Sequence, residues 1–131
     1  MVLLDTCAII WDALSPEKLT SSAKRAIELA DKHNEVIICD ISFWEISMLI
    51  KRNRLQIDVS ADNFLNLFLQ VRNSDVQCIT PDIAAVSVNF GDDLNKDPAD
   101  RLIAATSIVK NVPIVTADRN LRNSKLLATI W

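Results

Sequence analysis

The sequence is poor in several residue types on which common catalytic sites depend. It has one glycine, Gly91, so it cannot form a glycine-rich loop that cradles a phosphate. Its one histidine, His33, stands in a polar stretch at a predicted helix end, which excludes a histidine-based triad and a zinc cluster. The three cysteines form no Cys-x-x-Cys pair. We interpret Cys7, Cys39 and Cys78 as free thiols of the core.

Long apolar runs and an excess of basic residues are also missing. No run approaches the roughly 20 residues of a membrane-spanning helix, and no basic segment precedes an apolar stretch at the N-terminus. With free thiols, this predicts a cytoplasmic protein without a membrane partner. The net charge of −3 argues against a non-specific DNA coat. This charge does not exclude a nuclease whose acidic residues are concentrated at one site.

Half of the 131 residues are hydrophobic, which suffices for the core of one domain spanning residues 1–131. Short apolar runs predict strands at residues 2–5, 36–40, 77–81 and 113–118, with a weaker strand at 128–131. Helical patterns lie between them, at residues 20–33, 41–52, 61–73, 81–90 and 97–111. This alternation predicts an α/β fold with a mainly parallel sheet of four to five strands and helices on both faces. The carboxyl ends of such strands share one edge, where ligands bind.

Two acids stand at that predicted edge. Asp5 ends the first predicted strand and Asp118 ends the fourth. Either residue alone is explained as well by a helix cap or a solvated turn as by a functional role.

Glu45 is harder to explain as an ordinary surface residue. On the predicted helix it shares a stripe with Ile41, Met48 and Leu49. A carboxylate among apolar side chains is costly without a partner and tends to take up a proton. Either a structural salt bridge or a bound cation could satisfy it.

Two further acids open the helix predicted at residues 97–111. Asp97 is a natural N-cap because Pro98 falls at the first helical position. Asp100 shares a stripe with Ile103 and Ser107 that faces the sheet. The helix dipole favours a first-turn acid by only about 0.3–1 kcal/mol, which does not explain an inward position. Asp100 is therefore a candidate functional residue.

Asp5, Glu45, Asp100 and Asp118 all start from the same edge. Two carboxylates about 4 Å apart repel by roughly 4 kcal/mol at an effective dielectric constant near 20. A divalent cation would relieve that repulsion, and an oxygen-only set selects Mg²⁺ or Mn²⁺. Such ions activate water and clamp a phosphoryl group. The four acids are thus candidate metal ligands and catalytic residues.

Other assignments remain open or fail on single residues. A haloacid-dehalogenase phosphatase needs a second aspartate where the chain has Cys7. A phosphoacceptor domain needs an aspartate after the third strand, where Thr80 and Pro81 stand. A non-catalytic module that binds RNA or protein remains the alternative function.

Several segments together resemble a known family. They are "LLDTCAIIW", "SPEKLTSSAKRAIELA", "WEIS", "DPADRLIAATSIVKNVPIVTADRNL" and the terminal "ATIW". These segments are similar to those of PIN domains, and specifically of the VapC-type toxin ribonucleases of bacterial toxin–antitoxin pairs. The resemblance implies a three-layer PIN-like fold.

The resemblance also implies site residues and an activity. The family's acidic quartet falls on Asp5, Glu45, Asp100 and Asp118, with Thr6 and Thr116 as polar supports and Asp97 beside them. Position 7 often carries serine or asparagine in relatives, so Cys7 puts a supporting hydrogen bond there in doubt. By resemblance, the chain is a Mg²⁺-dependent endoribonuclease, inhibited by a cognate antitoxin whose tail enters the acidic groove.

Basic residues flank the predicted acids and could bind RNA phosphates, or could form an ordinary solvated surface. They are Lys51, Arg52, Arg54, Lys96, Arg101, Arg119 and Arg122.

The helix predicted at residues 61–73 has more apolar surface than one contact with a sheet uses. Its apolar residues are Phe64, Leu65, Leu67, Phe68, Leu69 and Val71. The segment 43–50 is likewise apolar on more than one face. We therefore expect a homodimer.

Overall fold

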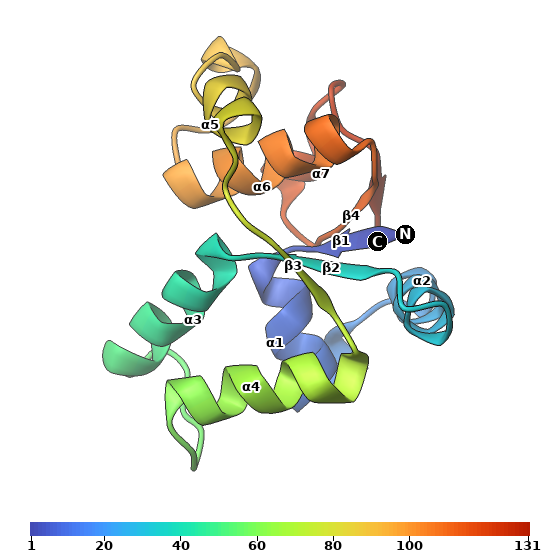
Figure 1. Cartoon of the computed structure of the whole chain (residues 1–131), viewed down its shortest axis with the longest axis vertical. Coiled ribbons are helices and arrows are strands. Elements are labelled where there is room, and N and C mark those ends of the chain that lie inside the picture. The colour runs from blue at the N-terminus through green and yellow to red at the C-terminus, as the bar shows by residue number, and fades with distance from the viewer.

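A computed structural model describes all residues from 1 to 131 and contains one five-stranded sheet (Figure 1). The strand order is β3-β2-β1-β4-β5, and every neighbouring pair is parallel. The strands are β1 (Val2–Leu4), β2 (Val36–Cys39), β3 (Asp75–Gln77), β4 (Ile114–Val115) and β5 (Thr129–Ile130). The prediction of a parallel sheet is confirmed, and the carboxyl ends of all five strands lie at one edge.

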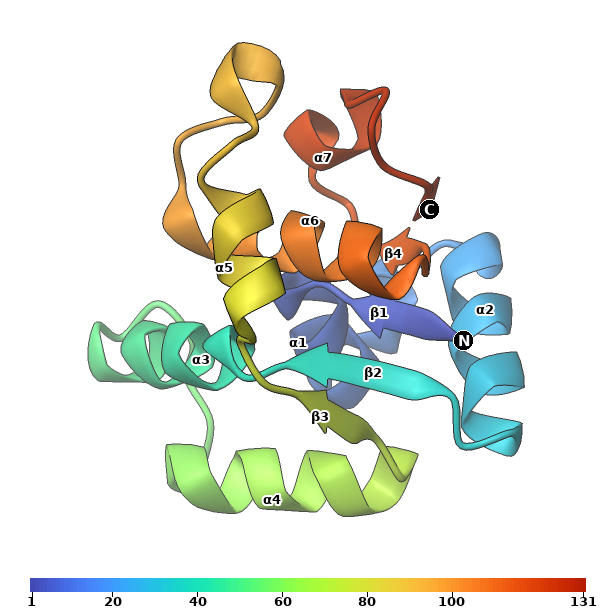
Figure 2. The ribbon, with the colours of Figure 1, turned by 45° about the horizontal axis from the view of Figure 1, so that its top comes forward.

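The chain has seven α-helices, which pack around this sheet with α5 and α7 lying on α6 (Figure 2). They are α1 (Thr6–Leu14), α2 (Ser21–Lys32), α3 (Ile41–Lys51), α4 (Ala61–Arg72), α5 (Pro81–Ser87), α6 (Pro98–Lys110) and α7 (Arg119–Asn123), with short 3₁₀ turns at Pro16–Lys18 and Gly91–Asp93. Leu4 and Ile38 pack in one core cluster with α1 to α4, whereas Leu3 and Ile37 face α6 on the other side. The three-layer arrangement is therefore confirmed.

Two helices and one strand differ from the prediction. The run from Val2 to Leu14 is nearly continuous in hydrophobicity, and Asp5 divides it into β1 and α1 by accepting a hydrogen bond from Thr6 N at 2.8 Å. Helix α7 has only five residues, too few to show a helical period. The third strand occupies residues 75–77 and not 77–81, because Ile79 N donates to Asp40 Oδ2 and Thr80 already caps α5.

The prediction that all three cysteines belong to the core is wrong. Cys39 is buried, Cys7 is half-buried, and Cys78 is exposed just beyond the edge strand β3. All three thiols are free, as expected.

Four asparagines take the left-handed backbone conformation that glycine usually supplies. Asn34, Asn53, Asn73 and Asn111 have φ values of 56°, 56°, 47° and 53°. Asn73 and Asn111 end α4 and α6. Asparagine tolerates this region better than most residues and commonly ends helices there.

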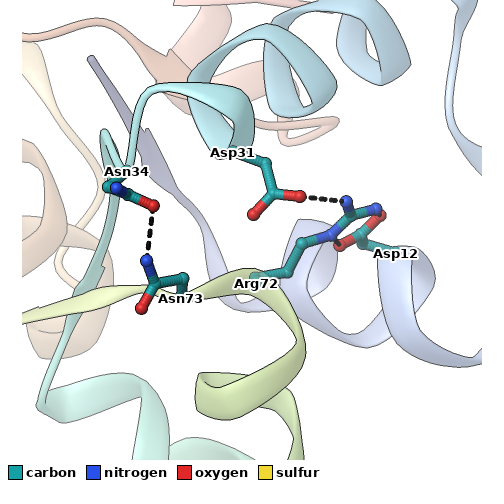
Figure 3. Close-up of polar contacts among 5 residues, drawn as sticks. All are labelled: Asp12, Asp31, Asn34, Arg72 and Asn73. Atoms are coloured by element: carbon teal, nitrogen blue, oxygen red, sulfur yellow. Dashed lines mark hydrogen bonds and ion pairs between the residues drawn. The ribbon is translucent and has the colours of Figure 1, made fainter.

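Helix α4 is tied to α1 and α2 by one arginine (Figure 3). The Arg72 guanidinium donates to both carboxylate oxygens of Asp12 at 2.7 Å and to Asp31 Oδ2 at 3.1 Å. Asn73 donates a further hydrogen bond to Asn34, in the turn that follows α2. We call Arg72, Asp12 and Asp31 the arginine bridge.

The helices are too short or too polar to cross a membrane.

Candidate active site

All four predicted acids line one pocket of about 360 Å³ at the carboxyl edge of the sheet. Its lining residues are Asp5, Thr6, Cys7, Ile10, Trp11, Glu45, Leu49, Asp100, Ala117 and Asp118. We call it the acidic pocket. Its acids come from the loops after β1 and β4 and from helices α3 and α6.

Asp5 lies deepest and is 5% exposed. Thr116 Oγ1 donates to Asp5 Oδ2 at 2.6 Å, and Thr6 N donates to Oδ1 at 2.8 Å. The Cys7 thiol also donates to Oδ2, at 3.4 Å. Position 7 therefore supplies a supporting hydrogen bond to Asp5 even though it carries cysteine in place of serine or asparagine. Burial nevertheless raises the pKa of Asp5 above its ordinary value, because these donors only partly compensate for lost solvation.

Glu45 reaches the pocket from one turn into α3. The Thr6 hydroxyl donates to Glu45 Oε1 at 2.6 Å and also lies 2.9 Å from Ser42 Oγ. The pKa of Glu45 is raised to about 7, chiefly by burial and in smaller part by the charges of Asp5, Asp100 and Asp97, while the hydrogen bond from Thr6 acts to lower it. Glu45 forms no ion pair with any basic residue, so the structural salt bridge considered from the sequence is absent.

Asp97 caps a helix, and Asp100 lines the acidic pocket, as the sequence predicted for each. Asp97 caps α6 by accepting from Asp100 N at 3.0 Å. The Asp100 carboxylate accepts from Asn95 Nδ2 at 2.8 Å. Burial raises the pKa of Asp100 to about 6, with smaller contributions from the charges of Asp5, Asp97 and Asp118.

Asp118 combines a cap with a place in the pocket. Its Oδ1 accepts from Leu121 N at 3.0 Å and begins α7. Its own backbone N donates to Thr116 Oγ1 at 3.0 Å. Thr116 therefore joins the loops that hold Asp5 and Asp118.

Residues 2–125 match the family described as "PIN domain". The chain belongs to the PIN domain family. It is 35% identical over 133 aligned residues to "Ribonuclease VapC22" of Mycobacterium tuberculosis, which covers 99% of this chain and 98% of that protein.

Solved structures agree with this PIN domain fold. A chain of VapBC2 from Rickettsia felis, solved bound to a DNA fragment from its promoter, aligns with a TM-score of 0.74 at 18% identity, covering 98% of this chain and 97% of that one. A toxin–antitoxin complex of Klebsiella pneumoniae aligns at 0.67 and 18%, with the same coverage. FitAcB of Neisseria gonorrhoeae aligns at 0.61 and 19%, covering 98% and 96%. At these identities the likeness concerns the fold.

The acids of this PIN domain fit a hard divalent cation by their chemistry. They are oxygen donors only, three of them have raised pKa values, and no basic side chain forms an ion pair with them. As they stand, no three His, Cys, Asp or Glu side chains are close enough together to hold an ion. Mg²⁺ usually keeps several of its waters and is held by one or two carboxylates, so a set of three is not required.

Sequence reasoning missed two residues that support the acids, Asn95 directly and Ser42 through Thr6. Ser42 is fully buried one turn before Glu45 and contacts the Thr6 hydroxyl. Asn95 donates to Asp100 and lies in a polar loop whose pattern gives no indication of the contact. The spacing of Ser42 and Glu45 on one helix could have suggested the first of these.

The basic residues predicted to bind RNA divide into groups. Arg52 and Arg54 line a larger hollow of about 780 Å³ along α3, which shares Glu45 with the acidic pocket. Lys51 is exposed at the end of α3. Arg101 donates to the backbone carbonyls of Asn95, Gly91 and Leu94, so its guanidinium holds the loop before α6.

The remaining basic residues line two further hollows of the PIN domain. Lys96 lines a shallow hollow beside Arg101. Arg119 and Arg122 line a separate hollow with Trp131.

Proposed function

We propose that this PIN domain is an endoribonuclease that depends on Mg²⁺ or Mn²⁺ and acts as the toxin of a toxin–antitoxin pair. The observation that carries the proposal is the acidic pocket, in which four carboxylates from distant parts of the sequence face one space without a basic partner. The relative named "Ribonuclease VapC22", similar over its full length, supports the choice of RNA as substrate.

Asp5, Glu45, Asp100 and Asp118 would hold the cation. When bound, Mg²⁺ or Mn²⁺ would supply activation of water and neutralisation of charge on the phosphate. The protein's own part is positioning: Thr116 and Thr6 fix the carboxylates of Asp5 and Glu45 by short hydrogen bonds. Rigid placement of this kind supplies much of the catalytic effect in phosphoryl-transfer sites.

The negative charge of the pocket also supports an antitoxin partner. A peptide tail that enters the pocket and carries a basic side chain would neutralise the carboxylates and exclude RNA. Two of the matching solved structures are described as a VapBC assembly and a toxin–antitoxin complex, which supports a partner of this class.

The test is cleavage of single-stranded RNA by the purified protein. We expect cutting with Mg²⁺ or Mn²⁺, none in EDTA, and a loss of about 100-fold or more in Asp5→Asn and Asp100→Asn. Asp75→Asn is the matched control, because Asp75 is exposed at the amino end of edge strand β3, away from the carboxyl edge that bears the acidic pocket. Full activity in the Asp5 and Asp100 variants would show that this pocket is not the catalytic site.

A non-catalytic binding module is the second candidate. The observation in its favour is that no three acidic side chains lie close enough together, as they stand, to hold an ion. Calorimetric titration with Mn²⁺ separates the two: heat of binding that disappears in Asp100→Asn supports the nuclease, and no binding supports the module.

A further inference from the structure

A hollow beside the acidic pocket combines two arginines with an aromatic ring. It has a volume of about 480 Å³ and is lined by Arg119, Arg122, Asn123, Thr129 and Trp131. We call it the basic hollow. Arg119 and Arg122 are exposed, and neither forms an ion pair or a side-chain hydrogen bond within the protein. No carboxylate side chain lines the hollow, so its side chains carry positive charge only.

Two tryptophans connect the basic hollow to the acidic pocket. Trp131 lines the basic hollow and Trp11 lines the acidic pocket. Their ring centroids are 5.6 Å apart, with the ring planes tilted by 49°. Lys18 Nζ lies 5.8 Å from the centroid of Trp11 and adds a third cation near this pair. The aromatic surface is therefore continuous between the two sites.

The backbone fixes this arrangement. Ile130 pairs with Val115, and Thr116 N donates to Ile130 O at 3.2 Å, which places Trp131 at the level of Thr116. The Thr116 hydroxyl in turn donates to Asp5 at 2.6 Å. On the other side, Arg119 directly follows Asp118 in sequence. The same two segments thus position the acids and the basic hollow.

We propose that the basic hollow is a subsite for one nucleotide of single-stranded RNA, next to the phosphodiester held at the acidic pocket. The base stacks on Trp131, and Arg119 and Arg122 bind the adjoining phosphate. Proteins bind single strands by this combination of an aromatic platform with cations along the backbone. The subsite would hold the RNA strand next to the bond that is cut. It rests on the proposed function because that cleavage belongs to the acidic pocket.

The larger hollow along α3 is a weaker candidate for the same role. It also offers an exposed tryptophan, Trp44, together with Arg52 and Arg54. Its lining, however, includes Asp40, Glu45 and Asp97, whose charges oppose a phosphate. The basic hollow has the cations without acidic side chains.

The test measures binding in EDTA, so that it does not depend on cleavage. A labelled hexanucleotide of adenosine is titrated with protein and followed by fluorescence anisotropy. We expect Trp131→Ala to weaken binding by about 10-fold, because the stacking of one base is removed. Trp131→Phe keeps an aromatic ring and should restore most of the affinity. A hexameric abasic deoxyribose-phosphate strand should bind wild type and Trp131→Ala equally.

The arginines are tested through salt dependence. Arg119→Ala and Arg122→Ala should each reduce the slope of log K against log salt, by about 0.7 for each phosphate of a single strand that the protein no longer neutralises. Lys110→Ala is the matched control, because Lys110 is exposed at the far end of α6 from Asp100 and should leave the slope unchanged.

The results separate this subsite from the proposed function. Unchanged affinity in Trp131→Ala, with an unchanged salt slope in the two arginine variants, would overturn the subsite, even if the protein cuts RNA. Binding that depends on Trp131 and the arginines in a protein that cuts no RNA would keep the nucleotide site and reject the nuclease. Thermal melts of each variant establish that the comparison is between folded proteins.

Discussion

Glu45 lies on α3 among hydrophobic side chains, but the fully buried side of that helix is formed by Ser42 and Ile46. The stripe of Ile41, Glu45 and Leu49 instead lines the open hollows beside the sheet edge. The sequence could not distinguish these two faces because the helix is apolar nearly all round. The predicted consequence, a glutamate with a raised pKa, is confirmed all the same, since burial and neighbouring acids act on it in the half-buried position.

The raised pKa of Glu45 makes a prediction about pH. A carboxyl whose pKa is higher in the folded than in the unfolded state favours folding at low pH, and that contribution is lost as the group ionises. With a folded pKa of about 7, the metal-free protein should lose stability as pH rises from about 4.5 through 7. Asp100, with a pKa of about 6, acts in the same direction. Thermal melts in EDTA from pH 5 to pH 8 measure the effect.

The Glu45→Gln variant tests the cause. In EDTA near neutral pH it should melt higher than wild type, by roughly 2–5 °C after allowing for solvent screening of a half-exposed group. Added Mg²⁺ should stabilise wild type more than the variant, because the ion binds the ionised native cluster. A variant that melts below wild type in EDTA would show that the hydrogen bond from Thr6 stabilises the ionised Glu45 by more than its burial costs.

At the scale of elements, two acids of the acidic pocket also begin helices. Asp5 caps α1 and Asp118 caps α7, and Asp97, which lines the neighbouring hollow along α3, caps α6. Capping and a functional role are therefore compatible, although they appeared as alternatives in the sequence. The cap at Asp97 was predictable because Pro98 follows it. At Asp5 a helix cap was only one of the alternatives, since apolar residues on both sides conceal the change from strand to helix.

The arginine bridge makes a prediction for α4. Arg72 is 23% exposed and Asp12 6% exposed, so Arg72→Ala leaves a buried carboxylate without its partner. We expect a decrease of about 3 kcal/mol in the free energy of unfolding, or roughly 10 °C in Tm. Arg25→Ala, an exposed arginine of α2 without an ion pair, should change little. Urea denaturation measures the free energy of unfolding of both variants.

A double variant separates the charge from the packing. Arg72→Met with Asp12→Leu removes both partners and should recover most of the stability that Arg72→Ala removes, because no unpaired charge stays buried. A double variant as unstable as Arg72→Ala would mean that packing by the arginine stem, and not its charge, stabilises α4.

For the whole molecule, alternating strands and helices were enough to predict a parallel sheet with an acidic edge. The strand order and the faces that the helices cover could not be predicted, because they depend on contacts between distant segments. The edge strand β3 illustrates this limit. Asp75 and Val76 are exposed and carry no apolar pattern, so their pairing with β2 follows from position in the fold.

The expected homodimer remains a prediction, with a smaller surface than the sequence suggested. Phe64 and Phe68 are buried in the protein's own core, whereas Leu67 and Val71 are 59% and 66% exposed. Light scattering at micromolar concentration should give the mass of two chains, and Leu67→Glu should give the mass of one. Leu29→Glu, at a leucine 61% exposed on α2, is the matched control. A wild-type monomer would contradict the prediction.

The asparagines at positive φ affect the unfolded chain as well as the folded one. Glycine at those four turns would relieve backbone strain, but it would also give the denatured chain more conformations to lose on folding. With a single glycine in 131 residues, this chain begins folding from a comparatively restricted ensemble. Part of its stability therefore comes from the lower conformational entropy of the unfolded chain. Exchanging Asn111 for glycine should leave the free energy of unfolding nearly unchanged, because relief of backbone strain and the added entropy of the unfolded chain oppose each other.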